Sequence, residues 1–383
     1  MNPLSGNRSL DNRDAWAEVD LAVIVENARV LASLVPAGTR LAPVVKAEAY
    51  GHGAAATSLV LEAVGLGLFC VATIDEGLAL RDAGLQSAIL VLYEPPSGSW
   101  STAADAGLEI AVTSRPGLER AIAAASEASM PRVHLKIDTG MSRQGLLADD
   151  VAHAAEHVRQ LQTITAGIWT HLRDGADTES SAPQLARFDA AAQQLSRAGL
   201  SAPRHVAASA AIMTGQGIGY EIVRPGLALF GMTPVEALAQ GLSLPEGIHA
   251  ALSVHARPVR LVRLPTGTPV GYGGTFVTER LTLLATLPLG YADGVFRSLS
   301  DGKWNVLVRG QRAPVVGRVS MDGITVDVTD VEGVSRADVF TVLGRQDSEE
   351  LTANAMASAA GTIPQEIAVR LTARLPFLYR ANG

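Results

Sequence analysis

The chain has 383 residues, a formal net charge of −7, 48% hydrophobic residues and only 4% aromatic residues. This length allows one large domain with a smaller one, and the composition can supply a core of Ala, Val, Leu and Ile. The mild acidity, without a cluster of Lys and Arg that could follow phosphates, argues against a nucleic-acid partner. A single cysteine, Cys70, excludes an intrachain disulfide framework, and its apolar surroundings indicate a core residue.

Residues 1–14 are interpreted as an N-terminal extension without the apolar stretch of a secretory signal. No later run approaches the ~20 apolar residues that span a bilayer. We therefore expect a cytoplasmic protein without a membrane partner.

Short apolar runs alternate with alanine-rich helical stretches from about residue 41 to residue 230. Because helical patterns follow most of the runs, the sequence predicts a parallel sheet with crossover helices. A closed (β/α)8 barrel over residues 15–240 suits the number of runs. An open doubly wound sheet is the alternative, although no GxGxxG motif follows the first run. The expected strands are 41–45, 68–72, 88–92, 109–112, 133–137, 164–168, 204–207 and 222–230.

The pattern changes after about residue 245, where short β-branched runs are separated by Gly, Pro and Asp. Such runs are typical of antiparallel strands, so residues 241–383 are predicted to form a C-terminal β domain. One helical stretch interrupts it near residues 350–361. The expected fold class is therefore α/β, with an N-terminal barrel followed by a β-rich domain.

Polar side chains follow several of the predicted barrel strands. In a closed barrel these positions converge on one mouth, which is where such folds place their active sites. Each residue alone has an ordinary explanation, such as a surface lysine whose stem packs on apolar groups or a glycine in a tight turn. Their convergence instead favours a cationic mouth that binds a phosphate or carboxylate. The residues are Lys46, Tyr50, Gly51, His52, Gly53, Lys136, Asp138, Arg143, His171, Ser209 and Arg224.

Two other chemistries are disfavoured by the sequence. The histidines show no HExxH or paired-cysteine spacing, and His153 and His157, four residues apart, fall on a helix expected to be exposed. No GxSxG nucleophile elbow is present either. We therefore expect no metal site.

The stretch VVKAEAYGHGA, residues 44–54, resembles the motif V-V-K-A-N-A-Y-G-H-G around the cofactor lysine of alanine racemases. The resemblance continues in order through KIDTGMSRQGL (136–146), WTHL (169–172), HVAASAA (205–211), VRPGLALFG (223–231), GYGGTF (271–276), LGYADG (289–294) and GRVSMDG (317–323). It covers nearly the whole chain. The family consists of fold-type III enzymes that depend on pyridoxal 5'-phosphate (PLP), with a PLP-binding barrel followed by a β domain.

The resemblance implies a racemase that interconverts L- and D-alanine through an external aldimine with PLP. Removing a proton from one face of Cα and returning it to the other needs two bases, and the family's bases correspond to Lys46 and Tyr272. Arg224 would donate to the pyridine nitrogen and leave it neutral, since arginine stays protonated. A neutral ring is a weaker electron sink, which favours racemisation over transamination. The implied cofactor-binding residues are Lys46, Tyr50, His171, Ser209, Arg224, Gly226 and Leu227.

Other implied roles concern the substrate and the partner subunit. Arg143 and Met321 would bind the substrate carboxylate, and Lys136 matches a lysine that supports this arginine and is carbamylated in parts of the family. Tyr291 and Arg297 resemble residues of the substrate entrance. Because Tyr272 and Met321 would reach the site of the other subunit, the resemblance implies a homodimer with shared active sites.

Several positions depart from the family pattern, and they cluster near the implied site. The departures leave two alternatives open: a racemase of serine or another small amino acid, and a weakly active homologue. A non-catalytic PLP-binding protein of the single-domain barrel type is disfavoured by the predicted β domain that carries Tyr272 and Met321. A PLP-dependent decarboxylase on the same fold is disfavoured, because those enzymes use a cysteine in the second domain. The departing residues are Glu48, Gln144, Leu172, Arg173, Ala208, Ser320, Gly323 and Gln365.

Overall fold

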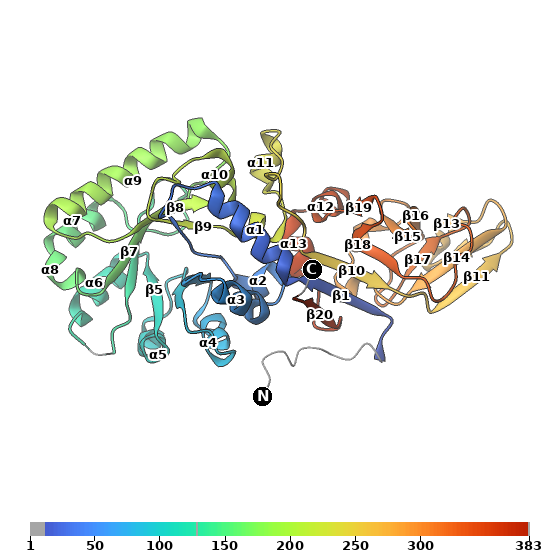
Figure 1. Cartoon of the computed structure of the whole chain (residues 1–383), viewed down its shortest axis with the longest axis horizontal. Helices are drawn as coiled ribbons and strands as arrows, with labels where there is room; N and C mark the ends of the chain where they lie inside the picture. The colour runs from blue at the N-terminus through green and yellow to red at the C-terminus, as the bar shows by residue number, and fades with distance from the viewer. Residues whose placement is uncertain (1–11, 128, 382–383) are drawn as a thin grey trace. The chain divides into compact units, whose positions relative to one another are not determined.

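Two compact units make up the chain, and the structure, a computed structural model, describes residues 12–127 and 129–381 (Figure 1). One unit, the barrel unit, spans Ile24–Ile248. The other, the β unit, joins the described residues up to Val23 to those from His249 onward. Residues 1–11 of the predicted N-terminal extension lie outside the described residues.

Eight parallel strands form the sheet of the barrel unit, in the order β2-β9-β8-β7-β6-β5-β4-β3. The ring is completed just beyond β2, where Val44 forms a parallel bridge with Cys70 and the Val45 N–H donates to the Cys70 carbonyl at 2.8 Å. The predicted closed barrel is therefore confirmed. The strands are β2 (Arg40–Leu41), β3 (Leu68–Val71), β4 (Ala88–Val91), β5 (Leu108–Val112), β6 (Val133–Lys136), β7 (Thr165–Trp169), β8 (Arg204–Ala208) and β9 (Ile222–Arg224).

Helices surround these strands (Figure 1). The core cluster between the strands consists of aliphatic side chains with Cys70 and one tryptophan, Trp169. Local chemistry sets the limits of the longest helix, α9 (Thr178–Ala198). The Asp177 side chain accepts two of its first N–H groups, and Gly199 ends it in the left-handed conformation with φ of 105°. The other helices are α1 (Leu21–Ser33), α3 (Ala54–Ala63), α4 (Ile74–Asp82), α5 (Trp100–Asp105), α6 (Arg115–Ala124), α7 (Ala148–Glu156), α8 (Val158–Leu161), α10 (Ser209–Thr214) and α11 (Val235–Ala239), besides the short turn α2 (Lys46–Gly51).

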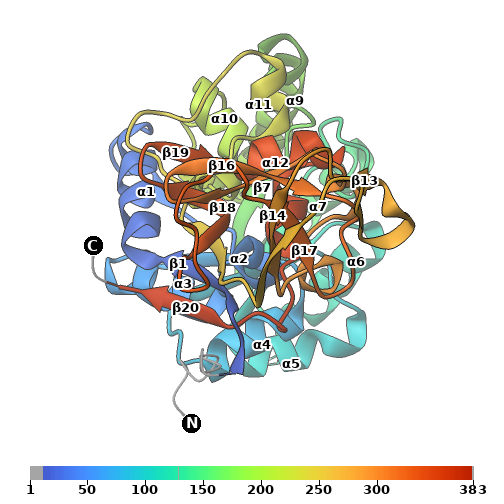
Figure 2. The same cartoon turned by 90° about the vertical axis from the view of Figure 1, so that its right-hand side faces the viewer.

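The β unit is built on a sheet of order β11-β14-β17-β16-β15-β18-β10-β1-β20, with β19 paired to β18 and a separate β12-β13 pair (Figure 2). Its pairs are antiparallel except β1 with β20. The helix predicted near 350–361 is α12 (Ala353–Ala360), followed by α13 (Pro364–Val369). The strands are β1 (Ala15–Asp20), β10 (Leu252–Ala256), β11 (Arg260–Leu264), β12 (Pro269–Val270), β13 (Phe276–Val277), β14 (Thr282–Leu287), β15 (Asn305–Val308), β16 (Gln311–Val316), β17 (Ile324–Asp327), β18 (Phe340–Gln346), β19 (Glu349–Leu351) and β20 (Phe377–Arg380).

The first strand differs from the sequence-based expectation, which assigned residues from 15 onward to the barrel. Strand β1 lies instead in the β unit, where Ala15 to Val19 pair with β10 and Ala17 to Asp20 pair with β20. The physical reason is that β1 supplies hydrogen-bonding edges to both neighbours and a largely buried face to that core. A linear hydrophobic pattern does not reveal which sheet a strand joins.

Among the described residues, no helix is both long enough and apolar enough to cross a membrane.

Candidate active site

Lys46 stands at the end of the first barrel strand segment and begins the short turn α2. Residues Ala47 to Tyr50 of this turn are left-handed, with φ between 49° and 55°. Burial, and after it the positive charge of Arg143, lowers the pKa of the Lys46 ammonium. The half-buried amine is therefore easier to deprotonate than an ordinary lysine.

Glu48, the clearest departure from the family motif, is exposed on this turn. Its Oε2 accepts the Ala54 N–H at 3.0 Å, at the start of α3, while its own carbonyl accepts the Gly53 N–H at 2.8 Å. The glutamate therefore closes the loop between α2 and α3 and caps the next helix.

Hydroxyls and backbone N–H groups lie close together beside Tyr50. Ser209, the first residue of α10, accepts hydrogen bonds at Oγ from the N–H groups of Gly226 (3.0 Å) and Ala228 (3.1 Å). A Cβ on Gly226 would stand 2.9 Å from the Tyr50 hydroxyl, so glycine leaves the phenol room to lie against the backbone. Burial raises the pKa of Tyr50 to about 12, which keeps it a neutral donor. Leu227 follows this glycine at the start of a short 3-10 turn.

Arg224 begins a chain of hydrogen-bonded buried groups whose other members, His205, His134 and Glu109, were not predicted from the sequence. Its guanidinium lies 2.9 Å from His205 Nδ1, His205 Nε2 lies 2.9 Å from His134 Nδ1, and His134 Nε2 lies 2.7 Å from Glu109. Arginine can only donate, so each imidazole must accept at Nδ1 and donate from Nε2. Burial and the Arg224 charge hold the pKa of His205 well below its usual value. Both rings are therefore read as neutral, linking a buried cation to a buried carboxylate.

Arg224 remains charged at neutral pH, because burial lowers its pKa only to about 10. One of its Nη atoms also donates to the Thr170 carbonyl at 2.8 Å, which fixes the guanidinium plane. The Arg224 Cζ and Lys136 Nζ each lie 4.7 Å from the centroid of the Trp169 ring, and the His205 ring stacks on the same indole at 5.5 Å. The attraction of the two cations to the Trp169 ring offsets part of the free energy that their burial costs.

Positive charge dominates this end of the barrel. Burial, Arg143 and Arg224 lower the pKa of Lys136 to about 7. Burial and Arg224 lower the pKa of His171 to about 3, so this imidazole is neutral at physiological pH. A site that suppresses protonation in this way is suited to an anionic ligand.

The loop that carries Arg143 is folded by a single aspartate. Asp138 Oδ1 accepts the N–H groups of Gly140 (2.9 Å), Met141 (3.1 Å) and Ser142 (3.1 Å). The exposed Arg143 guanidinium lies 5.9 Å from the centroid of the Tyr93 ring. The geometry presents the guanidinium to a ligand while its backbone is held in place.

The predicted residues of the β unit are exposed rather than buried. Tyr272 is 71% exposed, Met321 52% and Tyr291 43%. Tyr272 follows Gly271, whose φ of 73° favours glycine. Tyr291 and Arg297 line a hollow of about 500 Å³ together with Gly294, Val295, Phe296, Arg370 and Thr372.

Backbone hydrogen bonds join the segments that carry Tyr291 and Met321. The Tyr291 N–H donates to the Ser320 carbonyl and the Ala292 N–H to the Met321 carbonyl, both at 3.0 Å. Gly290 lies so close to these two carbonyls that a Cβ could not be accommodated. The backbones of the two segments are therefore fixed relative to each other.

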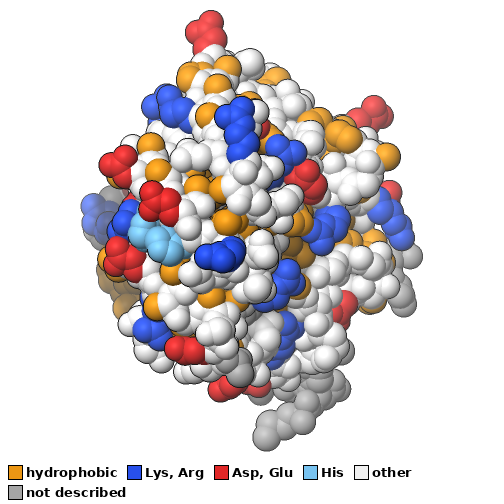
Figure 3. All heavy atoms as spheres, turned by 90° about the vertical axis from the view of Figure 1, so that its left-hand side faces the viewer, with side chains coloured by type: hydrophobic (Ala, Val, Ile, Leu, Met, Phe, Trp, Pro, Cys, Tyr) orange, Lys and Arg blue, Asp and Glu red, His pale blue; other side chains and the backbone are white. Residues whose placement is uncertain are grey.

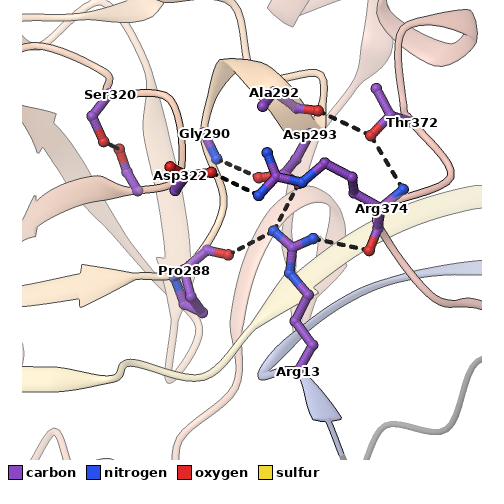
Figure 4. Close-up of polar contacts among 10 residues, drawn as sticks. Arg13, Pro288, Gly290, Ala292, Asp293, Ser320, Asp322, Thr372 and Arg374 are labelled. Carbon is purple, nitrogen blue, oxygen red and sulfur yellow. Dashed lines mark hydrogen bonds and ion pairs between the residues drawn. The ribbon is translucent and has the colours of Figure 1, made fainter.

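Asp293, which is fully buried, anchors these segments from behind (Figure 4). Its Oδ2 accepts the Gly290 N–H at 2.9 Å, and its Oδ1 forms ion pairs with Arg13 (2.7 Å) and Arg374 (3.5 Å). Arg374 also binds Asp322 at 2.6 Å, next to Met321 in the chain. Arg13, from the predicted extension, thus belongs to this network, as Figure 4 shows.

The structure therefore brings most predicted barrel residues into one region and groups Tyr291 with Met321 and with Arg297 in the β unit. Sequence reasoning gave no role to the buried His134 and His205, to Trp169 or to Asp293. One available signal was Glu109, a carboxylate inside the otherwise apolar strand LEIAV, because a buried charge needs a partner.

Among the described residues, one group has ligand atoms close enough to hold a metal ion: His153, Glu156 and His157, all within 4.8 Å. It lies at the end of α7, and none of its three residues belongs to the predicted site. Figure 3 shows charged side chains of both signs interspersed on the visible face, without a large basic patch.

The chain matches two family descriptions in succession. Residues 19–234 match "Alanine racemase, N-terminal domain", and residues 251–379 match "Alanine racemase, C-terminal domain". An alanine racemase of Carboxydothermus hydrogenoformans is 38% identical over 379 residues, covering 96% of this chain and 100% of that protein. One of Desulfovibrio desulfuricans is 36% identical, covering 96% of this chain and 98% of that protein.

Solved structures agree with this assignment. A crystal structure of alanine racemase from Bacillus anthracis with bound L-Ala-P has a TM-score of 0.88 at 30% identity, covering 97% of this chain and 96% of the other. Another, from Bartonella henselae with covalently bound pyridoxal phosphate, has a TM-score of 0.86 at 31% identity, covering 96% and 99%. Two successive domain matches, relatives over nearly the whole length and a shared fold lead to one conclusion: the chain belongs to the alanine racemase family, whose members are PLP-dependent isomerases.

Proposed function

We propose that this protein interconverts L- and D-alanine with PLP attached to Lys46. The observation that carries the proposal is the set of groups around this lysine: a half-buried amine of lowered pKa, a cluster of hydroxyls and N–H groups at Tyr50, Ser209 and Gly226, and a buried arginine. Such a cluster suits a phosphate, and the cationic surroundings suit the substrate carboxylate. Bound there, PLP would delocalise the electrons left on the substrate Cα and so lower the barrier to proton removal.

Each cofactor-binding residue has a role that fits its environment. Tyr50 and Ser209 would donate hydroxyl hydrogen bonds to the phosphate, and Gly226 and Leu227 would offer backbone N–H groups. His171, neutral because burial lowers its pKa to about 3, would lie beside the ring without adding charge.

Arg224 would set the electronic character of the site. It is held by His205 and Thr170 and remains charged with a pKa of about 10, so it would donate to the pyridine nitrogen rather than protonate it. This arrangement disfavours proton return at the cofactor side, which transamination would require. Racemisation at Cα is the outcome that such a site favours.

Lys46 and Tyr272 would act as the two bases on opposite faces of the substrate. The lowered pKa of Lys46 increases the fraction of free amine that can accept a proton. Tyr272, 71% exposed, would serve the active site of a partner subunit, which makes the working form a homodimer.

The remaining residues would position the substrate and control access. Arg143 would bind the substrate carboxylate, supported by Lys136, and Met321 would present its backbone to the same carboxylate. Tyr291 and Arg297 would line the entrance, as their shared hollow in the β unit suggests.

Serine or another small polar amino acid is a second candidate substrate. Gln365, at a position where the family usually has tyrosine, has a buried Oε1 without a hydrogen-bond donor among the described residues. The resemblance gives this position a contact with the cofactor phosphate, so the change from tyrosine would alter the site without fixing the substrate. Decarboxylation is disfavoured, since Cys70 is fully buried in the barrel unit and burial raises its pKa to about 12.

A panel of single L-amino acids tests the assignment. Purified protein with PLP is incubated with each one, and the D-isomer is measured by chiral chromatography. We expect D-alanine to form fastest. Turnover of another amino acid without turnover of alanine would refute the alanine assignment and support a related racemase.

A further inference from the structure

The turn that begins at Lys46 has an unusual backbone. Residues Ala47 to Tyr50 are all left-handed although none is glycine. For L-residues this conformation costs roughly 1–2 kcal/mol each and normally occurs at single positions. Such strain persists only where the surrounding structure fixes it. The question is therefore which groups hold the turn.

Part of the support comes from the turn itself. The Ala49 N–H donates to the Val45 carbonyl at 2.8 Å, and His52 Nδ1 lies within hydrogen-bond distance of the Ala49 and Tyr50 carbonyls. These contacts leave the first N–H of the turn, that of Ala47, without a partner inside it. This N–H belongs to the peptide bond that joins Lys46 to the strained segment.

Glu76 supplies that partner from a different element. Its Oε1 accepts the Ala47 N–H at 2.7 Å. Its Oε2 accepts the N–H groups of Ala72 (2.6 Å) and Thr73 (3.3 Å), at the junction between β3 and α4. One half-buried carboxylate thus ties the peptide next to Lys46 to the end of the neighbouring barrel strand.

We propose that Glu76 is a positioning residue for Lys46: its carboxylate holds the left-handed turn in register with the end of β3 and so aims the amine into the barrel mouth. The proposal rests on the proposed function, since the value of aiming Lys46 lies in its reaction with PLP and substrate. Neither the family motif nor the strand-end pattern of the sequence marks this glutamate.

Charge gives Glu76 a second effect on the same amine. The groups that act on Lys46 are Arg143 from the loop after β6, Lys136 from β6, Cys70 from β3 and Glu76 from α4, with the Tyr50 ring centroid 6.0 Å away. Glu76 opposes the lowering by burial and by Arg143, so it raises the pKa of Lys46. Loss of its charge should therefore move the Lys46 titration to lower pH.

An ordinary capping role must be separated from this one, because Glu76 also forms a capping box with Thr73 at the start of α4. The chain offers a matched control in Glu62. Its Oε1 accepts the N–H groups of Gln86 (2.9 Å) and Ser87 (2.6 Å), in the loop before β4, at the opposite ends of the strands from Lys46. Both glutamates hold backbone N–H groups between elements, but only Glu76 contacts the lysine turn.

The experiment compares Glu76→Ala, Glu76→Gln and Glu62→Ala with the wild type. Racemisation is measured as kcat and KM. In parallel, the titration of Lys46 in the cofactor-free chain is read from the pH dependence of its acetylation by acetic anhydride, followed by mass spectrometry. The second readout needs no activity and no cofactor.

For Glu76→Ala we expect kcat to fall about 10- to 100-fold, with KM changed less than about threefold, because misplacing a reacting group affects chemistry more than binding. Glu76→Gln keeps only one of the two acceptor oxygens and turns an NH2 group toward a backbone N–H, so its kcat should fall as well, by less than in Glu76→Ala. In both variants the Lys46 titration should move to lower pH. Glu62→Ala should lower the melting temperature without changing the titration.

Unchanged kcat and an unchanged Lys46 titration in Glu76→Ala would overturn the proposal and leave Glu76 as a helix cap. If Glu76→Ala does not fold, Glu76→Gln provides the test. A Lys46 titration that moves to lower pH in this variant supports the proposal, and an unchanged titration overturns it. If the wild type neither binds PLP nor racemises alanine, the proposed function fails. The acetylation profile still tests the contact between Glu76 and Lys46 in that case.

Discussion

In the barrel unit, Arg224 and Lys136 lie at 2% exposure among buried histidines, whereas the side chains of Tyr272, Tyr291 and Met321 in the β unit are exposed. The barrel residues are tuned by burial and by each other's charge, which sets their protonation. The segments that carry Tyr291 and Met321 are held by the buried ion pairs of Asp293 with Arg13 and Arg374. The comparison teaches that the proposed reaction has two requirements. The protonation states of the barrel residues must be set, and the side chains of the β unit must be accessible to a ligand or a partner subunit.

The largest effect should come from removing the barrel lysine. Lys46→Ala is expected to abolish racemisation and the visible absorbance of bound cofactor, because Lys136, the other amine of this mouth, lies over the Trp169 ring and not on the turn that begins at Lys46. Lys303→Ala, at an exposed turn of the β unit, is the control and should behave as the wild type. Full activity in Lys46→Ala would refute its catalytic role.

The next effect concerns the exposed phenol of the β unit. Tyr272→Phe should lower kcat by roughly 10²- to 10⁴-fold in at least one direction, the usual contribution of a general acid or base. Its thermal stability should hardly change, since the side chain is 71% exposed. Equal, wild-type rates in the L-to-D and D-to-L directions would disprove the two-base scheme.

The ion-pair network provides a stability test within the β unit. Asp293→Asn removes a fully buried charge that faces Arg13 and Arg374, and it should cost about 1–3 kcal/mol of unfolding free energy, because the arginines left behind are 19% and 45% exposed and can be hydrated. Asp322→Asn, whose side chain is 64% exposed, should cost less than about 1 kcal/mol. Denaturant unfolding measures both, and equal losses would contradict the anchoring role of Asp293.

A smaller effect should appear in the pH dependence of the barrel unit. Burial lowers the pKa of His52 to about 4 from an ordinary 6.5, so the unfolded chain binds this proton more readily. The stabilising contribution is complete above pH 6.5 and is lost as pH falls from there toward 4, with a slope of up to about 1.4 kcal/mol per pH unit.

Chemical unfolding between pH 7 and pH 4 should therefore show a shallower acid decline in His52→Phe than in the wild type. The phenyl ring can keep the stacking on Phe230, where the ring centroids are now 4.5 Å apart. Parallel stability curves for the two proteins would contradict the assigned role of His52.

Much of this architecture could be predicted from the sequence, because strand periodicity and strand-end polarity are local signals. The eight barrel strands and the cluster that includes Lys46, Ser209 and Arg224 follow from them. The left-handed turn could not be predicted, since Ala47 to Tyr50 carry no glycine. Contacts such as those of Glu76 depend on tertiary pairing, which a linear pattern does not contain.

Proton exchange at Cα tests the central claim most directly. The protein with PLP is incubated with L-alanine in D₂O, and NMR follows deuterium at Cα together with the appearance of D-alanine, with Lys46→Ala in parallel. The proposed function predicts D-alanine that carries deuterium at Cα, and no exchange in Lys46→Ala. Absence of exchange in the wild type, or the same exchange in both proteins, would contradict it.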